Sequence, residues 1–174
     1  MAVSARLDSE SLRRPVGLRV ARLVALAALS LVGCGPLGPI PGGALSGPLG
    51  ATDVQDWSFA ADVENAQLET RPGDPHSVNT WFAALGPDLY VPTSMILGSN
   101  TPTERSWVKH VLDDDRVRIR LGGTVFERRA VRVSDGSDEY RAARVALEAR
   151  YDIAPEDRDP EREIWIFRLD PRTD

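Results

Sequence analysis

The stretch that decides the fold is residues 116–133, RVRIRLGGTVFERRAVRV. In its first half, aliphatic residues alternate with arginines, which is the two-residue period of a strand with one buried face. The Gly122–Gly123 pair then turns the chain, because glycine adopts the backbone angles that a tight hairpin loop requires. A second strand follows from residue 124 to residue 133. The stretch therefore predicts an antiparallel hairpin with one face turned towards a core.

Further strands are predicted on both sides of this hairpin. The apolar segment 78–85 runs into a Gly-Pro-Asp turn and then into residues 89–92, so these two segments are expected to pair as a second hairpin. Residues 57–63 read as an earlier strand, with residues 67–70 as its continuation or its neighbour. Residues 163–169, EIWIFRL, are apolar on both faces and are therefore expected as a central strand.

Two helices are predicted between the strands. Residues 101–104, Thr-Pro-Thr-Glu, have the pattern of a capping box with proline at the first helical position, so a helix is expected from there to about Asp114. A second helix is expected from Ser137 to about Arg150, with one apolar stripe. Strands joined by sequential hairpins, with two helices inserted, predict an α+β, mainly β, fold: an antiparallel β-barrel with two helices.

Charge is divided unevenly along the 174 residues. The chain has 21 basic and 26 acidic side chains, and residues 1–52 carry a net charge of +3 whereas residues 53–174 carry −8. A domain that acidic repels polyanions, so nucleic acid is not expected as a partner. The single cysteine excludes an internal disulfide and a multi-cysteine zinc site.

The N-terminal leader has the pattern of a secretory signal peptide. Arginines precede an uncharged apolar run at residues 23–32, which is too short for a bilayer-spanning helix of about 20 residues. The end of this run, Leu31-Val32-Gly33-Cys34, resembles the lipobox of bacterial lipoproteins. The resemblance implies that residues 1–33 are a removable signal peptide and that the Cys34 thiol receives a diacylglycerol. The alternative is a buried structural cysteine at the end of an apolar helix.

A segment rich in glycine and proline follows the cysteine. Residues 35–50, GPLGPIPGGALSGPLG, contain six glycines and four prolines. This density disfavours helices and strand ladders, so residues 34–52 are expected to be the lipidated cysteine plus a flexible, disordered linker, and residues 53–174 the folded domain.

The lipid anchor expected at Cys34 implies export and attachment to a membrane. Gly35 stands where many inner-membrane lipoproteins have aspartate, which by resemblance favours the outer membrane, facing the periplasm, if the host is Gram-negative.

Four segments of the domain form a recognisable set. They are residues 78–91 (VNTWFAALGPDLYV), 105–112 (RSWVKHVL), 114–123 (DDRVRIRLGG) and 166–172 (IFRLDPR). Together they resemble the split-barrel flavin-binding proteins, the fold of pyridoxamine 5′-phosphate oxidase and of the deazaflavin-dependent nitroreductases. The resemblance covers about residues 66–172 and implies a split β-barrel, a family in which FMN or a deazaflavin is bound and homodimers are common.

By position, the resemblance implies a cofactor site of five residues. Thr93 and Ser94 would donate to phosphate oxygens, whereas Arg105, Trp107 and Lys109 would supply charge and a stacking surface. Each residue also has a simpler interpretation, as part of a turn, as core or as surface charge. No catalytic residue is identified.

One loop departs from the family pattern. Residues 71–77, RPGDPHS, carry Asp74 where the nitroreductases have a basic, glycine-rich loop, so an anionic cofactor tail would find weaker compensation there. We therefore expect a membrane-anchored split-barrel binding or accessory module without a bound flavin. The alternative is a flavin- or deazaflavin-dependent oxidoreductase that acts on small molecules.

Other chemistry finds little support in the sequence. The two histidines, His76 and His110, lack partners at metal-ligand spacing, so no metal site is expected. Ser106 and His110 are spaced to share a helical face, but no orienting acidic residue accompanies them, and a hydrolase triad is not expected.

Overall fold

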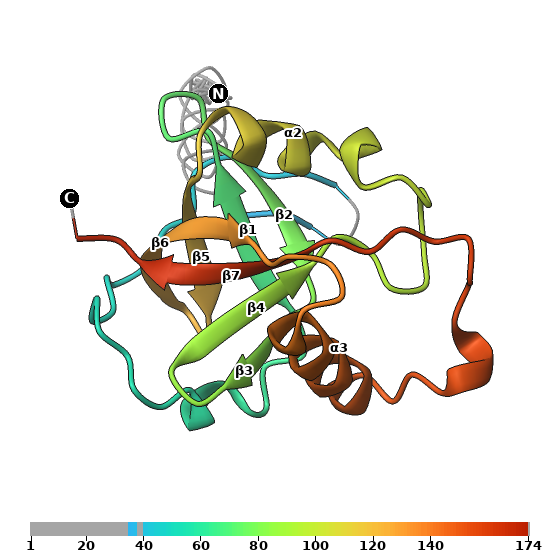
Figure 1. The fold of residues 1–174 in the computed structure, drawn as a ribbon. Helices are drawn as coiled ribbons and strands as arrows, with labels where there is room; N and C mark the ends of the chain where they lie inside the picture. Colours follow the sequence, from blue (N-terminus) through green and yellow to red (C-terminus); the bar gives the residue numbers. More distant parts are fainter. Residues whose placement is uncertain (1–34, 38–39, 174) are drawn as a thin grey trace, which may run out of the picture. The chain divides into compact units, whose positions relative to one another are not determined.

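The structure is a computed structural model that describes residues 35–37 and 40–173 (Figure 1). The predicted signal peptide and the predicted lipidation site, Cys34, lie outside the described residues. Within the described ranges, no helix has the length and apolar character needed to cross a bilayer.

Seven antiparallel strands form one sheet in the order β2-β1-β5-β6-β7-β4-β3 (Figure 1). The strands are β1 (Ala66–Thr70), β2 (His76–Thr80), β3 (Ala83–Leu85), β4 (Asp88–Pro92), β5 (Arg116–Leu121), β6 (Thr124–Arg132) and β7 (Ile166–Pro171). The helices are α2 (Ser106–Asp113) and α3 (Asp138–Arg150), with short 3₁₀ turns η2 (Ser58–Ala60), η3 (Pro102–Glu104) and η4 (Pro155–Asp157). The predicted fold, an α+β, mainly β, split β-barrel with two helices, is confirmed.

The hairpin of residues 116–133 forms as its alternation predicts. β5 and β6 pair from Arg116↔Arg129 to Leu121↔Thr124, and the aliphatic residues of β5 are buried. Gly122 and Gly123 have φ values of 55° and 91°, in the region that side chains with a Cβ adopt only under strain. The glycine pair is therefore what allows so short a connection.

β7 joins the two parts of the sheet. It pairs with β6 on one side and with β4 on the other, and its side chains alternate between two cores. Phe167 packs inside the barrel with residues such as Leu68 and Ile119, whereas Ile166 packs beneath α3 with Leu147. The prediction of a central strand with two apolar faces is thus confirmed.

Two predicted strands differ from the observed elements. Residues 57–63 contain the 3₁₀ turn η2 instead of a strand, because Trp57 is buried and donates its indole N–H to the Pro87 carbonyl at 2.8 Å. The segment 78–85 is divided into β2 and β3. The break falls where the Phe82 N–H donates to the Tyr151 hydroxyl at 3.0 Å instead of to a neighbouring strand.

The predicted helix of residues 101–114 is also divided. η3 occupies Pro102–Glu104, and α2 begins only at Ser106, because Arg105 adopts an extended backbone with φ −82° and ψ 127°. The Thr101 side chain makes no capping hydrogen bond, and the Glu104 carboxylate accepts a hydrogen bond from the Ser99 hydroxyl instead. The capping box therefore marks a turn and not the start of the helix.

The described part of the predicted linker packs against the barrel. We call residues 40–52 the strap. The strap exchanges two 2.8 Å backbone hydrogen bonds between Gly42 and Ser77 at the edge strand β2, and Gly50 donates to the Val125 carbonyl in β6 at 2.8 Å. Between these points Leu45 is only 3% exposed. Glycine and proline exclude a helix here, but they permit this extended path, so the free, disordered linker of the sequence analysis is not what the structure shows.

The far end of the strap rests on a buried arginine. Arg128 is 1% exposed and donates to the Thr52 carbonyl at 2.7 Å. Its guanidinium lies 5.3 Å from the Trp57 ring centre and 5.6 Å from the Phe126 ring centre, a cation–π arrangement. Burial lowers the pKa of Arg128, opposed by the charge of Asp53. The strap thus supplies a hydrogen-bond acceptor to a guanidinium that the barrel has removed from water.

Two leucines of the strap test whether it is packed. Leu45→Ala should lower the free energy of unfolding by about 2 kcal/mol, the lower end of the range for a buried leucine, because it empties a filled site. Leu49→Ala, whose side chain is 66% exposed, should change it by less than about 0.5 kcal/mol. Urea unfolding followed by tryptophan fluorescence measures both. Equal small effects would mean that the segment is a free tether.

Candidate functional site

One pocket of about 460 Å³ opens between the end of β2, the end of β4 and the start of α2. Its volume lies within the roughly 300–1,000 Å³ of small-molecule sites. The polar and aromatic side chains on its wall include Trp81, Thr93, Ser94, Arg105, Ser106 and Trp107.

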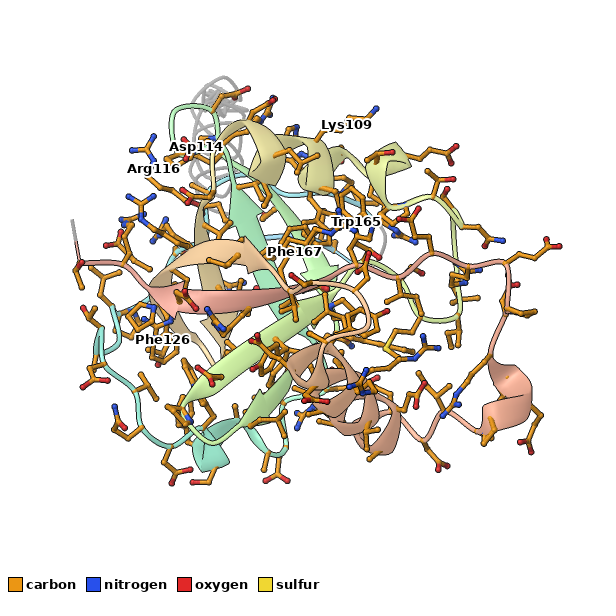
Figure 2. All side chains as sticks on the ribbon, in the orientation of Figure 1. Lys109, Asp114, Arg116, Phe126, Trp165 and Phe167 are labelled. Atoms are coloured by element: carbon orange, nitrogen blue, oxygen red, sulfur yellow. The ribbon has the colours of Figure 1, made fainter. Side chains whose placement is uncertain are left out.

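The pocket brings together four of the five residues that the resemblance implied. Thr93 and Ser94 follow β4, Arg105 precedes α2, and Trp107 lies in its first turn. Lys109 does not line the pocket: it is exposed on α2 and points away from the sheet (Figure 2). The position of Lys109 two residues after Trp107 therefore did not indicate a place at the pocket, since residues two apart on a helix face different directions.

Thr93 links the pocket wall to the central strand. Its backbone N–H donates to the Trp165 carbonyl at 2.9 Å, and its hydroxyl accepts the Trp165 N–H at 3.1 Å. The side chain is 6% exposed. A hydroxyl that accepts one hydrogen bond still has a proton to donate, so Thr93 is both a structural contact and a possible donor to a ligand.

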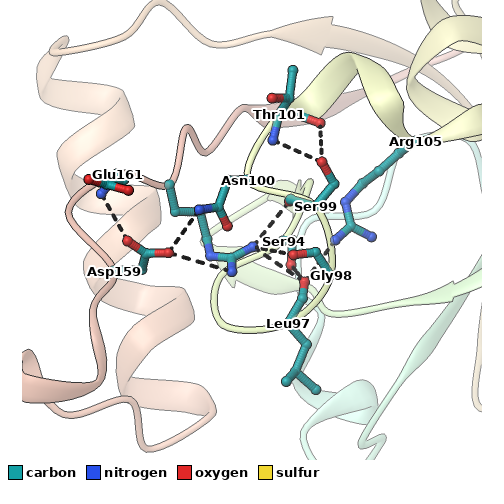
Figure 3. A network of polar contacts seen from close by, with 10 residues as sticks. Ser94, Leu97, Gly98, Ser99, Asn100, Thr101, Arg105, Asp159 and Glu161 are labelled. Atoms are coloured by element: carbon teal, nitrogen blue, oxygen red, sulfur yellow. Dashed lines mark hydrogen bonds and ion pairs between the residues drawn. The ribbon is translucent and has the colours of Figure 1, made fainter.

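The loop after Ser94 lines one side of the pocket, and Figure 3 shows the polar contacts within this loop. The Ser94 hydroxyl donates to the Leu97 carbonyl, and the same carbonyl accepts from Arg105 Nη2 at 2.8 Å. Burial lowers the pKa of Arg105, and the neighbouring charge of Arg162 lowers it further. The pocket therefore carries positive charge that is partly withdrawn from water.

Two indoles are part of the apolar surface of the pocket. Trp107 is 5% exposed and meets Phe167 edge to face, with ring centres 5.6 Å apart. Trp81 stacks on Tyr151 at 4.2 Å with the rings nearly parallel. Trp81 was missed as a site residue because it stood within an apolar segment predicted to be one strand; the break between β2 and β3 places it at the pocket.

The two histidines meet beside the pocket. Their rings lie edge to face at 5.0 Å, although 34 residues separate His76 from His110. His76 Nε2 lies 3.2 Å from the Ser106 hydroxyl, and His110 Nδ1 lies 3.0 Å from the Thr70 hydroxyl. Ser106 is thus paired with His76 and not with its helical neighbour. Sequence spacing gave no signal of this cluster.

Burial is the main cause that lowers the pKa of both imidazoles. The charge of Arg71 acts in the same direction on both, and His76 adds to it at His110. Asp74 opposes the shift at both rings and Asp113 at His110. Over the described residues, no group of three or more His, Cys, Asp or Glu side chains is placed to hold a metal ion.

The seven-stranded antiparallel sheet with its two helices has the split-barrel architecture. The chain matches no family model, and no curated protein is similar to it in sequence.

Solved structures are similar in fold. A conserved hypothetical protein from Mycobacterium tuberculosis superposes with a TM-score of 0.51 at 19% identity, over 72% of this chain and 86% of that one. An F420-H2-dependent reductase superposes with a TM-score of 0.49 at 16% identity, over 62% of this chain and 95% of that one. A pyridoxamine 5′-phosphate oxidase-related, FMN-binding protein from Nostoc punctiforme superposes with a TM-score of 0.39 at 13% identity, over 62% of this chain and 71% of that one. At such identities the likeness concerns the fold alone.

The histidine cluster predicts a loss of stability in mild acid. Because the folded chain lowers the pKa of both imidazoles, the unfolded chain takes up protons first as the pH falls through the ordinary histidine value of about 6.5. The free energy of unfolding should therefore decrease between pH 7.5 and pH 5.5. Urea unfolding at each pH should show a shallower decrease for the double variant His76→Gln, His110→Gln. Parallel pH profiles for the two proteins would contradict this account.

Proposed function

We propose that the pocket binds a flavin-type ligand, FMN or a deazaflavin, and that the protein is an oxidoreductase acting on small molecules. The observation that carries the proposal is the composition of the pocket wall: two indoles and a half-buried guanidinium around about 460 Å³. Planar ring systems stack on indoles, and a guanidinium binds phosphate or carboxylate. The resemblance of residues 66–172 to flavin-binding split barrels agrees with this assignment.

The residues present fit such a ligand. Trp81 and Trp107 would contact the ring system, and Thr93, Ser94 and Arg105 would hold an anionic tail. Arg105 Nε is buried and has no hydrogen-bond partner among the described residues, so one donor at the pocket is unused. When bound, a flavin or deazaflavin supplies hydride transfer, and the protein supplies binding, orientation and exclusion of water.

A split-barrel binding or accessory module without flavin is the second candidate. Two observations favour it. Donors at the pocket are already engaged within the chain, because Ser94 and Arg105 both donate to the Leu97 carbonyl. In the loop before β2, Arg71 pairs with Asp74 at 3.0 Å, so the loop offers little net positive charge to a phosphate tail.

We also propose that the chain is anchored to a membrane through a lipid on Cys34. The support is the lipobox-like sequence alone. Expression of the full-length precursor in a bacterial host should yield a membrane-bound product whose N-terminal peptide begins at a diacylglycerol-modified Cys34. Cys34→Ser should remove the modification and release the protein from the membrane fraction. A Cys34 recovered as a free thiol within a longer N-terminal peptide would contradict the anchor.

Titration of the purified protein with FMN and with a deazaflavin, followed by tryptophan quenching and visible absorbance, separates the two candidate functions. The flavin proposal predicts saturable binding of one of them at micromolar concentration. Arg105→Gln should weaken that binding about tenfold, the effect of losing about 1.4 kcal/mol of interaction. Arg141→Gln is the matched control, because Arg141 is an exposed arginine of α3 outside the pocket. No binding of either ligand would favour the module without flavin.

A further inference from the structure

Two arginines hold the loop that borders the pocket (Figure 3). Arg105 reaches it from the start of α2, and Arg162 reaches it from the connection between η4 and β7. Arg105 Nη2 donates to the Leu97 carbonyl at 2.8 Å. Arg162 Nη1 lies 3.4, 3.2 and 3.1 Å from the carbonyl oxygens of Leu97, Gly98 and Ser99. Two guanidiniums from distant parts of the chain thus converge on the Leu97 carbonyl, and Arg162 also contacts the next two carbonyls.

The charge at this point is incompletely compensated. The Arg162 side chain is 7% exposed, and the carboxylate of Asp159 lies 3.8 Å from it, at the outer limit of an ion pair. Arg105 has no ion pair with any described residue. The Nε atoms of both arginines are buried and have no hydrogen-bond partner in the described part of the chain. Carbonyl dipoles satisfy hydrogen-bond donors but supply no net negative charge. The two guanidiniums therefore still lack a full negative counter-charge.

The closed loop depends largely on these polar contacts. The Leu97 side chain is 74% exposed, so closure buries little of its apolar surface. Gly98 has φ 80°, and a Cβ there would lie 2.5 Å from Arg105 Nη2, so the loop needs glycine to approach the guanidinium this closely. A guanidinium binds a carboxylate or phosphate through short, often paired hydrogen bonds, and the net negative charge of the oxyanion adds an attraction that a neutral carbonyl lacks. An anion could therefore compete with the loop carbonyls for the same donors.

We propose that Arg105, on the pocket wall, and Arg162, which lies against the loop and does not line the pocket, form an oxyanion subsite at the edge of the pocket. The loop of residues 97–99 gates this subsite, its carbonyls holding the donors that a phosphate or carboxylate group would take. This inference deepens the proposed function. It assigns the anionic tail of that ligand to a pair of guanidiniums, and it adds Arg162, which the family resemblance did not indicate, as the residue that couples ligand entry to loop release.

Inorganic phosphate is the probe that tests the subsite without any flavin. In calorimetric titrations at constant ionic strength, the full chain should bind phosphate in the millimolar range. Arg162→Gln and Arg105→Gln should each weaken binding at least tenfold, whereas the exposed-site control Arg141→Gln should not change it. Equal affinities in all four proteins, or no binding by the unaltered chain, would overturn the proposal.

A second measurement follows the gate in the unaltered chain and so does not depend on the folding of a variant. Chymotrypsin cleavage after the exposed Leu97 should become faster as phosphate displaces the loop, and it should not change when chloride replaces phosphate at the same ionic strength. Cleavage that phosphate slows or leaves unchanged would contradict gating.

Comparison of FMN with riboflavin separates this inference from the proposed function. If both hold, the unaltered chain prefers FMN, and Arg162→Gln reduces that preference. If the chain binds both ligands equally in both proteins, the pocket is a flavin site but the oxyanion subsite is wrong. If phosphate binds as predicted and neither flavin does, the subsite is retained and the flavin function is wrong.

Discussion

Backbone pairing along β7 joins the two halves of the barrel, and the remaining structure depends on it. β7 bonds to β6 through residues 167–171 and to β4 through residues 166–168, so it connects a four-stranded sheet to the β3–β4 hairpin. Its alternating side chains fill both cores, with Phe167 on one face and Ile166 on the other. Trp165, just before the strand, fixes Thr93 in the pocket wall. The same pairing that closes the fold therefore positions one side of the candidate site.

The sequence predicted those elements whose signal is local. The alternation and the glycine pair of residues 116–133 determine a hairpin regardless of its surroundings, and residues 166–169 show their burial on both faces directly. Prediction from the sequence was wrong where tertiary contacts override the local pattern. Trp57 interrupts a predicted strand because its indole reaches the Pro87 carbonyl, and the strap is ordered because the barrel offers it edge hydrogen bonds and a buried arginine. Composition alone could not show these contacts.

The candidate site divides in the same way. Resemblance indicated Thr93, Ser94, Arg105 and Trp107, which are close in sequence and lie together on the pocket wall. The features it did not indicate join distant segments: Arg162 beside Arg105, and His76 beside His110 and Ser106. Such pairs are set by how the two helices and the η4–β7 connection meet the barrel. No periodicity in the sequence reports that arrangement.

The central claim is that the pocket between β2, β4 and α2 takes a planar ligand against two indoles, and NMR of the four tryptophan indole N–H groups tests it most directly. Each indole N–H signal is assigned to its tryptophan by the single Trp→Phe variant in which that signal disappears. Addition of FMN or a deazaflavin should shift the Trp81 and Trp107 signals strongly and leave that of Trp57, which is bonded to the Pro87 carbonyl away from the pocket, in place. Saturating ligand that leaves Trp81 and Trp107 unshifted, or that shifts Trp57 instead, would contradict the assignment.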